Sequence, residues 1–469
     1  MTAHQSSEAV FHADDDHAKR SAMLIRGGRI ISFAVDRPDV FEGNVLIENG
    51  RITALGKYID APHADIVDAQ DRIVMPGLVN AHMHTWQTGL RGACADWALP
   101  DYLRDMHGKI GPRFTPEDVR LATLAGALNQ IACGTTTLGD WCHNNPTPDH
   151  TDGAIAGLQE SGVRAVFLHG APKPAPSPGQ PHFSQIPHPR DEVRRLASGA
   201  LSSSDALVTL GMAILGPHFS TSDVALRDLR LAREMGVIAS MHQSGSVAID
   251  DGAWGAVEKA GLIGSWMNVV HANKLPLDRL RRLVDGGVSF TSTPEVELSM
   301  GHGAPIVDQL LAMGAMPSLG VDVESVVSGE MLTVARFALA QQRASGHARL
   351  NEKPSDAHTS ASSLQALRWA TQGGARALGL DHRVGTLAPG MQADLVLIDT
   401  RALNLTPSHD PIASALQASL ANIEAVMIGG VWQKRDGKLL YQDLESLKRA
   451  LRVSGRRLLE PLHADASEA

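Results

Sequence analysis

Short apolar runs alternate with amphipathic helical stretches through the central part of the chain. Eight runs of strand length lie at residues 77–82, 134–140, 164–169, 207–215, 237–242, 266–271, 288–293 and 316–322. Helical patterns follow several of them, at residues 116–132, 222–236, 276–287 and 329–344. This alternation predicts eight strand–helix units and hence an α/β fold, a closed parallel (β/α)8 barrel, in which functional residues lie at the C-terminal ends of the strands. A doubly wound open sheet is less favoured, because no G-x-G-x-x-G segment follows an early strand.

Both flanks of this region have the texture of strands and hairpins. Short apolar runs broken by Gly, Asn-Gly and Asp occur at residues 23–34, 43–56 and 64–77, and again at 393–400 and 423–440. The expected segments are a polar tail at 1–21, β-rich flanks at 22–76 and 388–440, the barrel at 77–387, and a C-terminal helix and tail at 441–469.

Two further segments stand apart from this pattern. Residues 171–190 contain seven prolines directly after the third barrel strand. Two interpretations of this segment remain open, an irregular excursion or a lid or pocket wall at the catalytic end of the barrel. Residues 443–462 form a basic amphipathic pattern, which favours a helix docked on the protein surface or on a partner subunit rather than on a membrane.

Charge and composition narrow the classes of partner. The formal net charge of the 469 residues is −9, so no basic field is available for nucleic acid or an anionic membrane. No apolar stretch is long enough to span a bilayer, and the N-terminal residues lack the apolar core of a signal peptide. The three cysteines form no C-x-x-C pair, which argues against disulfides and favours a reducing, cytoplasmic location. The expected partner is a small, mostly uncharged substrate.

Histidines at strand ends are the strongest chemical signal. The chain has 21 histidines, more than its Trp, Tyr and Phe together. His82 and His84 end the first barrel strand, and side chains at i and i+2 share one face. His242, His271 and Asp322 end the fifth, sixth and eighth strands. Imidazole nitrogens suit zinc and similar divalent ions, and an aspartate can both bind the ion and accept a proton from its water.

Two signatures carry a family resemblance. The segment VMPGLVNAHMHTWQTGLRG around the first strand and the segment ATQGGARALGLDHRVGTLAPGMQADLVLID near the C-terminus resemble those of the amidohydrolase superfamily, in the branch of cytosine deaminase, 8-oxoguanine deaminase and atrazine chlorohydrolase. Phenylurea and molinate hydrolases resemble the same branch. The resemblance covers about residues 22–440 and implies that the two flanks form a composite β-sandwich. It also implies a homo-oligomer, a dimer or larger.

The resemblance also implies roles for the strand-end residues. His82, His84, His242 and Asp322 would bind one divalent ion, most often zinc, with iron, manganese or cobalt as alternatives. His271 would orient the attacking water or polarise the substrate, and His271 and Asp322 would be the catalytic pair. The fourth strand has no lysine to bridge a second metal, so a mononuclear site is expected.

One departure from the family pattern bears on the reaction. Deaminases of this branch usually read H-x-x-E after the fifth strand, whereas Gly245 stands here in place of the glutamate. A glycine cannot carry protons, which favours hydrolysis of an amide, urea or carbamate-like C–N bond by a metal-bound hydroxide. The alternative is a heterocycle deaminase in which Glu295, Glu297 or Glu324 supplies the carboxylate. An inactive barrel that binds a small molecule is the alternative from another class.

Candidate substrate contacts follow from position alone. Trp86 and Gln87 come directly after the first-strand histidines and are expected to face the pocket. His218 follows the fourth strand, Asn273 belongs to the sixth-strand motif, and Glu295 follows the seventh strand. Each of these side chains also has an ordinary structural explanation, as a packed aromatic ring or a hydrogen-bonded polar group.

Overall fold

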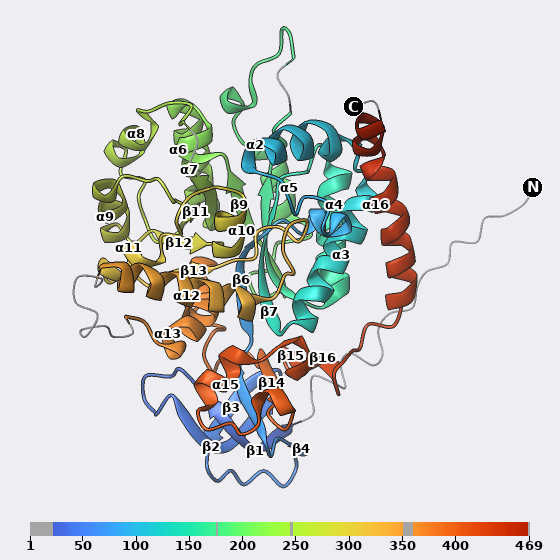
Figure 1. Cartoon of the computed structure of the whole chain (residues 1–469), viewed down its shortest axis with the longest axis vertical. Coiled ribbons are helices and arrows are strands. Elements are labelled where there is room, and N and C mark those ends of the chain that lie inside the picture. Colours follow the sequence, from blue (N-terminus) through green and yellow to red (C-terminus); the bar gives the residue numbers. More distant parts are fainter. Residues whose placement is uncertain (1–21, 175–176, 244–246, 350–359, 468–469) are drawn as a thin grey trace, which may run out of the picture.

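A computed structural model describes residues 22–174, 177–243, 247–349 and 360–467. Eight parallel strands form the central sheet of the upper body (Figure 1). They are β6 (Leu78–Met83), β7 (Thr135–Cys142), β8 (Arg164–Gly170), β9 (Val208–Ile214), β10 (Ala239–Gln243), β11 (Met267–His271), β12 (Ser289–Ser292) and β13 (Ser318–Leu319). Their order in the sheet is their order in the chain, which is the order of a (β/α)8 barrel. The predicted barrel is therefore confirmed.

The first and last strands meet at the catalytic end of the barrel. Met83 and Asp322 form a parallel bridge. The backbone N–H of Asp322 donates to the carbonyl of His82 at 3.0 Å, and the N–H of His84 donates to the carbonyl of Asp322 at 2.8 Å. The closure of the barrel thus brings the end of β6 directly against Asp322.

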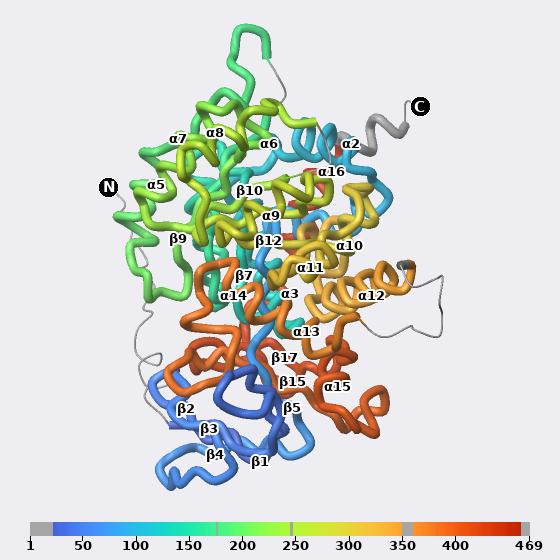
Figure 2. Tube along the Cα trace, turned by 90° about the vertical axis from the view of Figure 1, so that its left-hand side faces the viewer, coloured from blue at the N-terminus to red at the C-terminus, as the bar shows by residue number. Residues whose placement is uncertain are grey.

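Helices lie around the strands and cover the barrel (Figures 1 and 2). The α-helices are α2 (Leu99–Tyr102), α3 (Pro116–Ala132), α4 (Pro148–Ser161), α5 (Arg190–Ser198), α6 (Gly216–Phe219), α7 (Ser222–Met235), α8 (Ala253–Lys259), α9 (Leu277–Asp285), α10 (Pro294–Ser299), α11 (Val307–Ala312), α12 (Met331–Arg349), α13 (Ser363–Arg368), α14 (Gly374–Ala377), α15 (Pro411–Gln417) and α16 (Leu444–Ser467). Short 3₁₀ or π turns are η1 (Thr85–Leu90), η2 (Leu103–Ile110), η3 (Gly111–Arg113), η4 (Phe183–Gln185), η6 (Trp369–Gly373), η7 (Leu403–Leu405) and η8 (Leu420–Asn422).

Helix α3 illustrates why the sequence pattern was informative. Its N-terminus carries a capping box, in which the Thr115 hydroxyl accepts from the N–H of Asp118 and the Asp118 carboxylate accepts from the N–H of Thr115. Pro116 occupies the first turn, where a missing N–H costs nothing. The helix spans the range predicted from its apolar periodicity, residues 116–132.

The two flanks join in one nine-stranded mixed sheet below the barrel (Figure 2). Its strands are β1 (Met23–Ile31), β2 (Val40–Glu48), β3 (Arg51–Gly56), β4 (Asp65–Asp68), β5 (Arg72–Pro76), β14 (Leu395–Asp399), β15 (Ile423–Ile428), β16 (Val431–Arg435) and β17 (Lys438–Leu439). The antiparallel pairing of β5 with β14 connects the two flanks. Both flanks contribute to one apolar cluster that includes Ile30, Val45, Leu395 and Met427.

The two segments singled out by the sequence pack against the barrel. Helix α16 lies along α3, where the Ser454 hydroxyl donates to Asp118 at 2.6 Å and Arg457 also pairs with that carboxylate. The described part of the proline-rich segment lies beyond β8 and lines two cavities at the C-terminal end of the barrel. This placement agrees with the pocket-wall interpretation. Among the described residues, no helix is both long and apolar enough to cross a membrane.

Candidate active site

Five side chains predicted from strand ends converge inside the barrel mouth. One nitrogen or oxygen atom from each of His82, His242, His271 and Asp322 lies within 4.8 Å of the others. His82 Nε2 lies 3.2 Å from His242 Nε2 and 3.3 Å from Asp322 Oδ1. His84 Nε2 lies 3.5 Å from the same Asp322 oxygen. The structure thus brings the whole predicted set together, and the choice of His84 as ligand and His271 as orienting residue stays a prediction.

Hydrogen bonds outside this set orient two of the imidazoles. His84 Nδ1 lies 2.6 Å from the carbonyl of Trp141, so Nδ1 carries a proton and donates it, which leaves the lone pair of Nε2 directed at the site. His271 Nδ1 lies 3.3 Å from Glu297 Oε1, and His271 Nε2 lies 3.8 Å from Asp322 Oδ2. Partners of this kind fix the tautomer and ring orientation that a ligand or a proton carrier needs.

The backbone at the site adopts conformations that L-residues seldom occupy. His271 and Asp322 both have φ near +70°, and Ala272 has φ of +57°. Such left-handed residues other than glycine carry strain that the surrounding structure must hold, and they gather at functional sites. The positions of both residues are therefore determined by the barrel ends and not by local preference.

The electrostatics of the site favour neutral imidazoles beside an ionised carboxylate. Burial, followed by proximity to the His82 imidazole, lowers the pKa of His84 and His242 well below the usual value, and burial also lowers the pKa of His82. Burial alone would raise the pKa of Asp322, but the hydrogen bond from His82 and the nearby imidazoles lower it below its ordinary range. Burial likewise opposes the charge on His271, yet Glu297 and Asp322 raise its pKa. Neutral histidines with free lone pairs and a carboxylate are donors that fit zinc or a similar divalent ion.

Of the three glutamates proposed to replace the missing carboxylate, Glu297 alone touches this set among the described contacts. It is fully buried, and its two oxygens accept from the Thr293 N–H and the Ser292 hydroxyl, both at 2.8 Å, besides meeting His271. Glu324 is instead bonded to Thr88, Arg91, Asn129 and Gln130.

Glu295 lies on the same helix as Glu297, α10, but has different neighbours. Burial and the nearby Glu330 raise the pKa of Glu295, and Arg336 of α12 lowers it in part. The Glu295 carboxyl therefore lies near the start of α12 and not at the imidazoles. Gly245, where the family glutamate would stand, lies outside the described residues.

The other predicted contacts occupy the surroundings of the pocket. Gln87 donates to the Tyr102 hydroxyl and accepts from Ser325, so it positions Tyr102. The buried His218 accepts from Gln243 at 2.9 Å, and Gln243 accepts from the indole of Trp254. The side chains of Gln87, His218 and Gln243 do not line the cavity beside the imidazoles, whereas Tyr102 does.

Asn273 and Trp86 also lie outside that cavity. The amide of Asn273 donates to the carbonyls of Gly303 and Ala304, which holds the loop that carries His302. Trp86 is fully buried and faces a neighbouring, larger cavity. Their roles as substrate contacts stay predictions.

A small cavity of about 50 Å³ opens on four of the converging side chains, those of His84, His242, His271 and Asp322, and we call it the inner cavity. Its wall includes side chains that the sequence analysis did not single out, namely Leu99, Leu103, His107, His143, Lys173, Phe219, Met300, His302 and Val323. His143 comes directly after β7, and Lys173 comes three residues after the end of β8. The same strand-end rule that indicated the other residues would have found them, had it been applied to the second and third strands.

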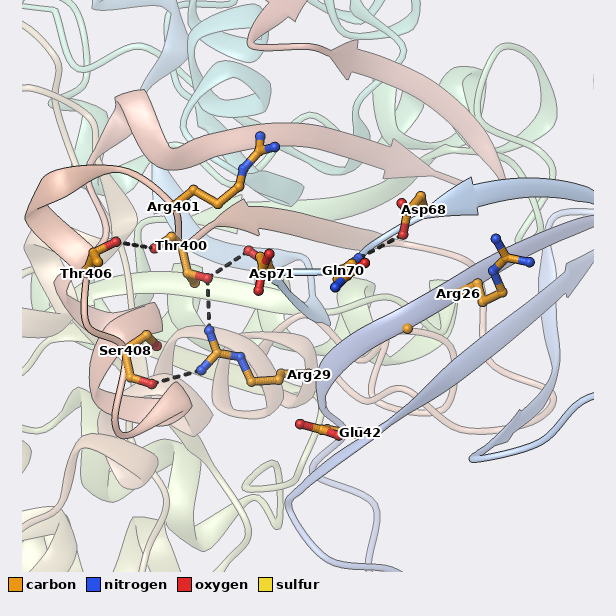
Figure 3. A pocket seen from close by; sticks show the side chains of 11 residues that line it. Arg26, Arg29, Glu42, Asp68, Gln70, Asp71, Thr400, Arg401, Thr406 and Ser408 are labelled. Carbon is orange, nitrogen blue, oxygen red and sulfur yellow. Dashed lines mark hydrogen bonds between the residues drawn. The ribbon is translucent and has the colours of Figure 1, made fainter.

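A separate hollow of about 920 Å³ lies in the lower sheet (Figure 3). Its charges are of both signs, and part of them bond to neighbouring side chains or to backbone. Arg29 donates to Thr400 and to the carbonyl of Ser408, and the Thr400 hydroxyl donates to the carbonyl of Asp71 (Figure 3). These groups are already partnered, so the hollow presents no set comparable to the barrel mouth.

Comparisons with known proteins agree with the fold. The model of the amidohydrolase family matches residues 73–433. The 8-oxoguanine deaminase of Pseudomonas aeruginosa is 29% identical over 433 residues, which cover 86% of this chain and 92% of that relative. The 5-methylthioadenosine/S-adenosylhomocysteine deaminase of Symbiobacterium thermophilum is 29% identical over 434 residues, with 90% and 94% covered.

Solved structures show the same fold. The atrazine chlorohydrolase of Arthrobacter aurescens in complex with zinc superimposes with a TM-score of 0.81 at 20% identity, over 92% of this chain and 99% of that chain. An adenosine deaminase of Xanthomonas campestris with bound zinc gives a TM-score of 0.77 at 24% identity, over 94% and 99%. Because the family model covers well over half of the chain, the protein belongs to the amidohydrolase family, whose members are metal-dependent, and it is a hydrolase that acts on carbon–nitrogen bonds.

Proposed function

We propose that this hydrolase deaminates a small amino-substituted heterocycle, with one zinc ion held by His82, His84, His242 and Asp322. Two relatives of nearly full length are deaminases of purine compounds, and zinc is present in two structures of the same fold. These findings favour the deaminase over the amide or urea hydrolase that Gly245 had suggested. The partner is then a small-molecule substrate.

The row of Glu297, His271 and Asp322 is the observation that carries this proposal. Deamination needs a group that takes a proton from water and a group that delivers protons to the ring nitrogen and the departing amine. Asp322 and His271 stand 3.8 Å apart at the inner cavity, with Glu297 behind the imidazole. The row therefore supplies proton carriers where Gly245 offers none.

The residues act in a defined order during turnover. A zinc ion at this site supplies Lewis acidity, which makes water acidic enough to attack near neutral pH. Asp322 takes the proton of the attacking water, and a carbon–oxygen bond forms at the carbon that bears the amino group. His271 keeps its Nδ1 proton against Glu297 and delivers its Nε2 proton to the ring nitrogen. Asp322 then passes the proton taken from water to the amino group, the carbon–nitrogen bond breaks, and ammonia leaves. The proton of the new hydroxyl group returns to His271 as the carbonyl group of the product forms, which restores both residues.

Hydrolysis of an amide or urea is the second candidate, and Gly245 is the observation that favours it. Cleavage at a carbonyl group requires no protonation of a ring nitrogen, so Asp322 alone can transfer the proton to the departing amine.

One assay separates the two reactions. The full chain, loaded with one equivalent of zinc, is incubated with 8-oxoguanine, 5-methylthioadenosine and cytosine, and separately with N-phenylurea. Free ammonia is measured, and products are identified by mass spectrometry. We expect ammonia from an aminoheterocycle, with oxygen in place of the amino nitrogen in the product, and no release by Asp322→Asn. Release of aniline from phenylurea, with no ammonia from any heterocycle, would replace deamination by the second candidate.

A further inference from the structure

A second cavity adjoins the inner one and is about ten times larger. This outer cavity, of about 550 Å³, is lined largely by apolar groups, among them Trp86, Phe183, Ile186 and Leu215. Its volume is in the range of sites that enclose a whole small molecule, whereas the inner cavity of about 50 Å³ admits only a few atoms. A substrate that reaches the converging imidazoles must therefore place the rest of its body elsewhere, and the outer cavity is adjacent.

Three side chains belong to the walls of both cavities, namely His107, His143 and Lys173. Lys173 lies between Pro172 and Pro174, whose rings restrict the backbone and hold the lysine in an extended segment. Its ammonium lies 4.5 Å from the ring centre of Phe219 and 5.7 Å from that of Trp141. Lys173 is thus a cation held by aromatic faces at the boundary of the two cavities.

This cation has no counter-charge within the part of the chain that the structure describes. No carboxylate pairs with it, and its effect on the neighbouring histidines His107, His143 and His218 is to lower their pKa values further. Burial lowers the pKa of Lys173 to about 8, which leaves most of it protonated at neutral pH. A partly buried charge without a partner is costly, so an anionic group that enters the cavity gains a strong interaction.

His143 provides a second unpartnered group at the same boundary. Its side chain is buried, and neither ring nitrogen has a hydrogen-bond partner among the described residues. An imidazole ring always carries at least one N–H, so His143 has a donor available for a ligand oxygen. Buried polar groups in folded proteins are nearly always paired, and a ligand oxygen would complete this one.

We propose that Lys173 and His143 form an anchor for a carboxylate or comparable anionic oxygen of the substrate, and that the outer cavity holds the apolar part of the same molecule. The proposal rests on the proposed function and narrows its substrate class. The reacting end of the substrate enters the inner cavity, its anionic group meets Lys173 and His143, and an aryl or alkyl portion fills the outer cavity. Lys173 is accordingly a residue that determines specificity.

Binding of unreactive probes tests this anchor without any turnover. The affinities of 2-naphthoate and of its neutral counterpart 2-naphthamide are measured by calorimetry on the zinc-loaded full chain. We expect naphthoate to bind about tenfold or more tightly than naphthamide. Lys173→Met should remove this difference, and Lys173→Arg should keep most of it. The matched control is Lys57→Met. Lys57 also lies over an aromatic ring, with its ammonium 5.6 Å from the ring centre of Tyr58, but it is an exposed residue that directly follows β3, away from both cavities.

Two further measurements distinguish binding at Lys173 and His143 from binding in the outer cavity and from coordination to zinc. Leu215→Trp reduces the outer cavity and should weaken both probes alike, and equal binding to wild type would overturn the placement of the apolar part. The titrations are repeated after removal of zinc with a chelator. A preference for naphthoate that disappears with the metal but survives Lys173→Met would show coordination to zinc and would overturn the anchor. Because no step requires catalysis, a failed deaminase assay leaves these results interpretable.

Discussion

Glu297 is the glutamate of α10 that contacts His271, and its role in catalysis can be tested apart from metal binding. It contacts His271 but none of the four residues proposed to hold zinc, so Glu297→Gln should leave the bound metal nearly unchanged while the His271 imidazole loses its charged partner. We expect kcat to fall by about 10- to 100-fold, with a small change in KM. Steady-state kinetics and metal analysis on the same preparation measure both effects.

The matched control for this substitution is two positions away on the same short helix. Glu295→Gln changes a carboxyl that lies near Glu330 and Arg336, and it should alter kcat by less than about threefold. An equal loss in both variants would mean that the helix, and not the contact with His271, is responsible.

A buried carboxyl far from the site offers a test by pH. Asp228 of α7 is buried, its carboxylate accepts from the N–H of His188 at 2.8 Å, and burial raises its pKa to about 7. The folded state therefore binds more protons than the unfolded state between about pH 4 and 7, and stability falls as the pH rises through this window. Asp228→Asn should stabilise the protein by about 2 kcal/mol more at pH 8 than at pH 5, as measured by denaturant unfolding.

The exposed Asp223 of the same helix provides the comparison for that measurement. It pairs with Arg227 at the surface, so Asp223→Asn should change stability by a similar small amount at both pH values. A pH-independent effect of Asp228→Asn would show that its carboxyl is ionised throughout the range.

The convergence of the candidate metal ligands was predictable because one rule locates them. His82, His242 and Asp322 follow apolar runs of strand length, and the ends of parallel strands meet at one edge of a barrel. The contact between Glu297 and His271 was not predictable, since it depends on how the turn after β12 directs α10. Three glutamates had similar positions in the sequence, and packing alone distinguishes them.

At the scale of elements, the sequence pattern located the strands, but tertiary contacts determined where they end. The apolar run at 316–322 predicted the eighth strand, but β13 includes only Ser318–Leu319. The chain departs from strand geometry at Asp322, whose φ is near +70°, and it is held there by bonds to the end of β6. The pattern thus located the strand, while the closure of the barrel determined where it ends.

Helix α16 packs on α3, η1 and η2, and its contact with α3 is open to test. Asp118 completes the capping box of α3 and also binds Ser454 and Arg457 of α16. Asp118→Ala removes a cap and a link between helices at once, so it should lower the free energy of unfolding by about 1–3 kcal/mol. Hydrogen exchange should show faster opening of α16 than of the barrel strands.

Asp149 is the matched residue on the neighbouring helix. It is exposed in the first turn of α4, so Asp149→Ala should cost no more than about 1 kcal/mol through the helix dipole. If both alanine variants lost the same stability, the contacts with α16 would contribute nothing measurable.

At the scale of the whole molecule, the barrel and the lower sheet are joined by a buried ion pair. Arg164 begins β8 at the barrel end opposite the site, and it donates to both oxygens of Asp394, at 2.7 and 2.9 Å. Asp394 also accepts from the N–H of Gly429, at 2.8 Å, beside the loop between β15 and β16. Both side chains are almost completely buried, so the charge of each is stabilised by the opposite charge of the other.

Arg164→Met should therefore be strongly destabilising, because it leaves the Asp394 carboxylate buried without a cation. We expect a loss of about 3–5 kcal/mol in denaturant unfolding, and partial recovery when Asp394→Asn is added. Arg120→Met, which removes a pair that α3 forms at the surface with Glu160, should cost no more than about 1 kcal/mol. Since the pair is at the far end of the barrel, folded Arg164→Met protein should bind added zinc as wild type does and keep its kcat. Loss of activity without loss of stability would instead mean that the lower sheet controls the geometry of the barrel mouth.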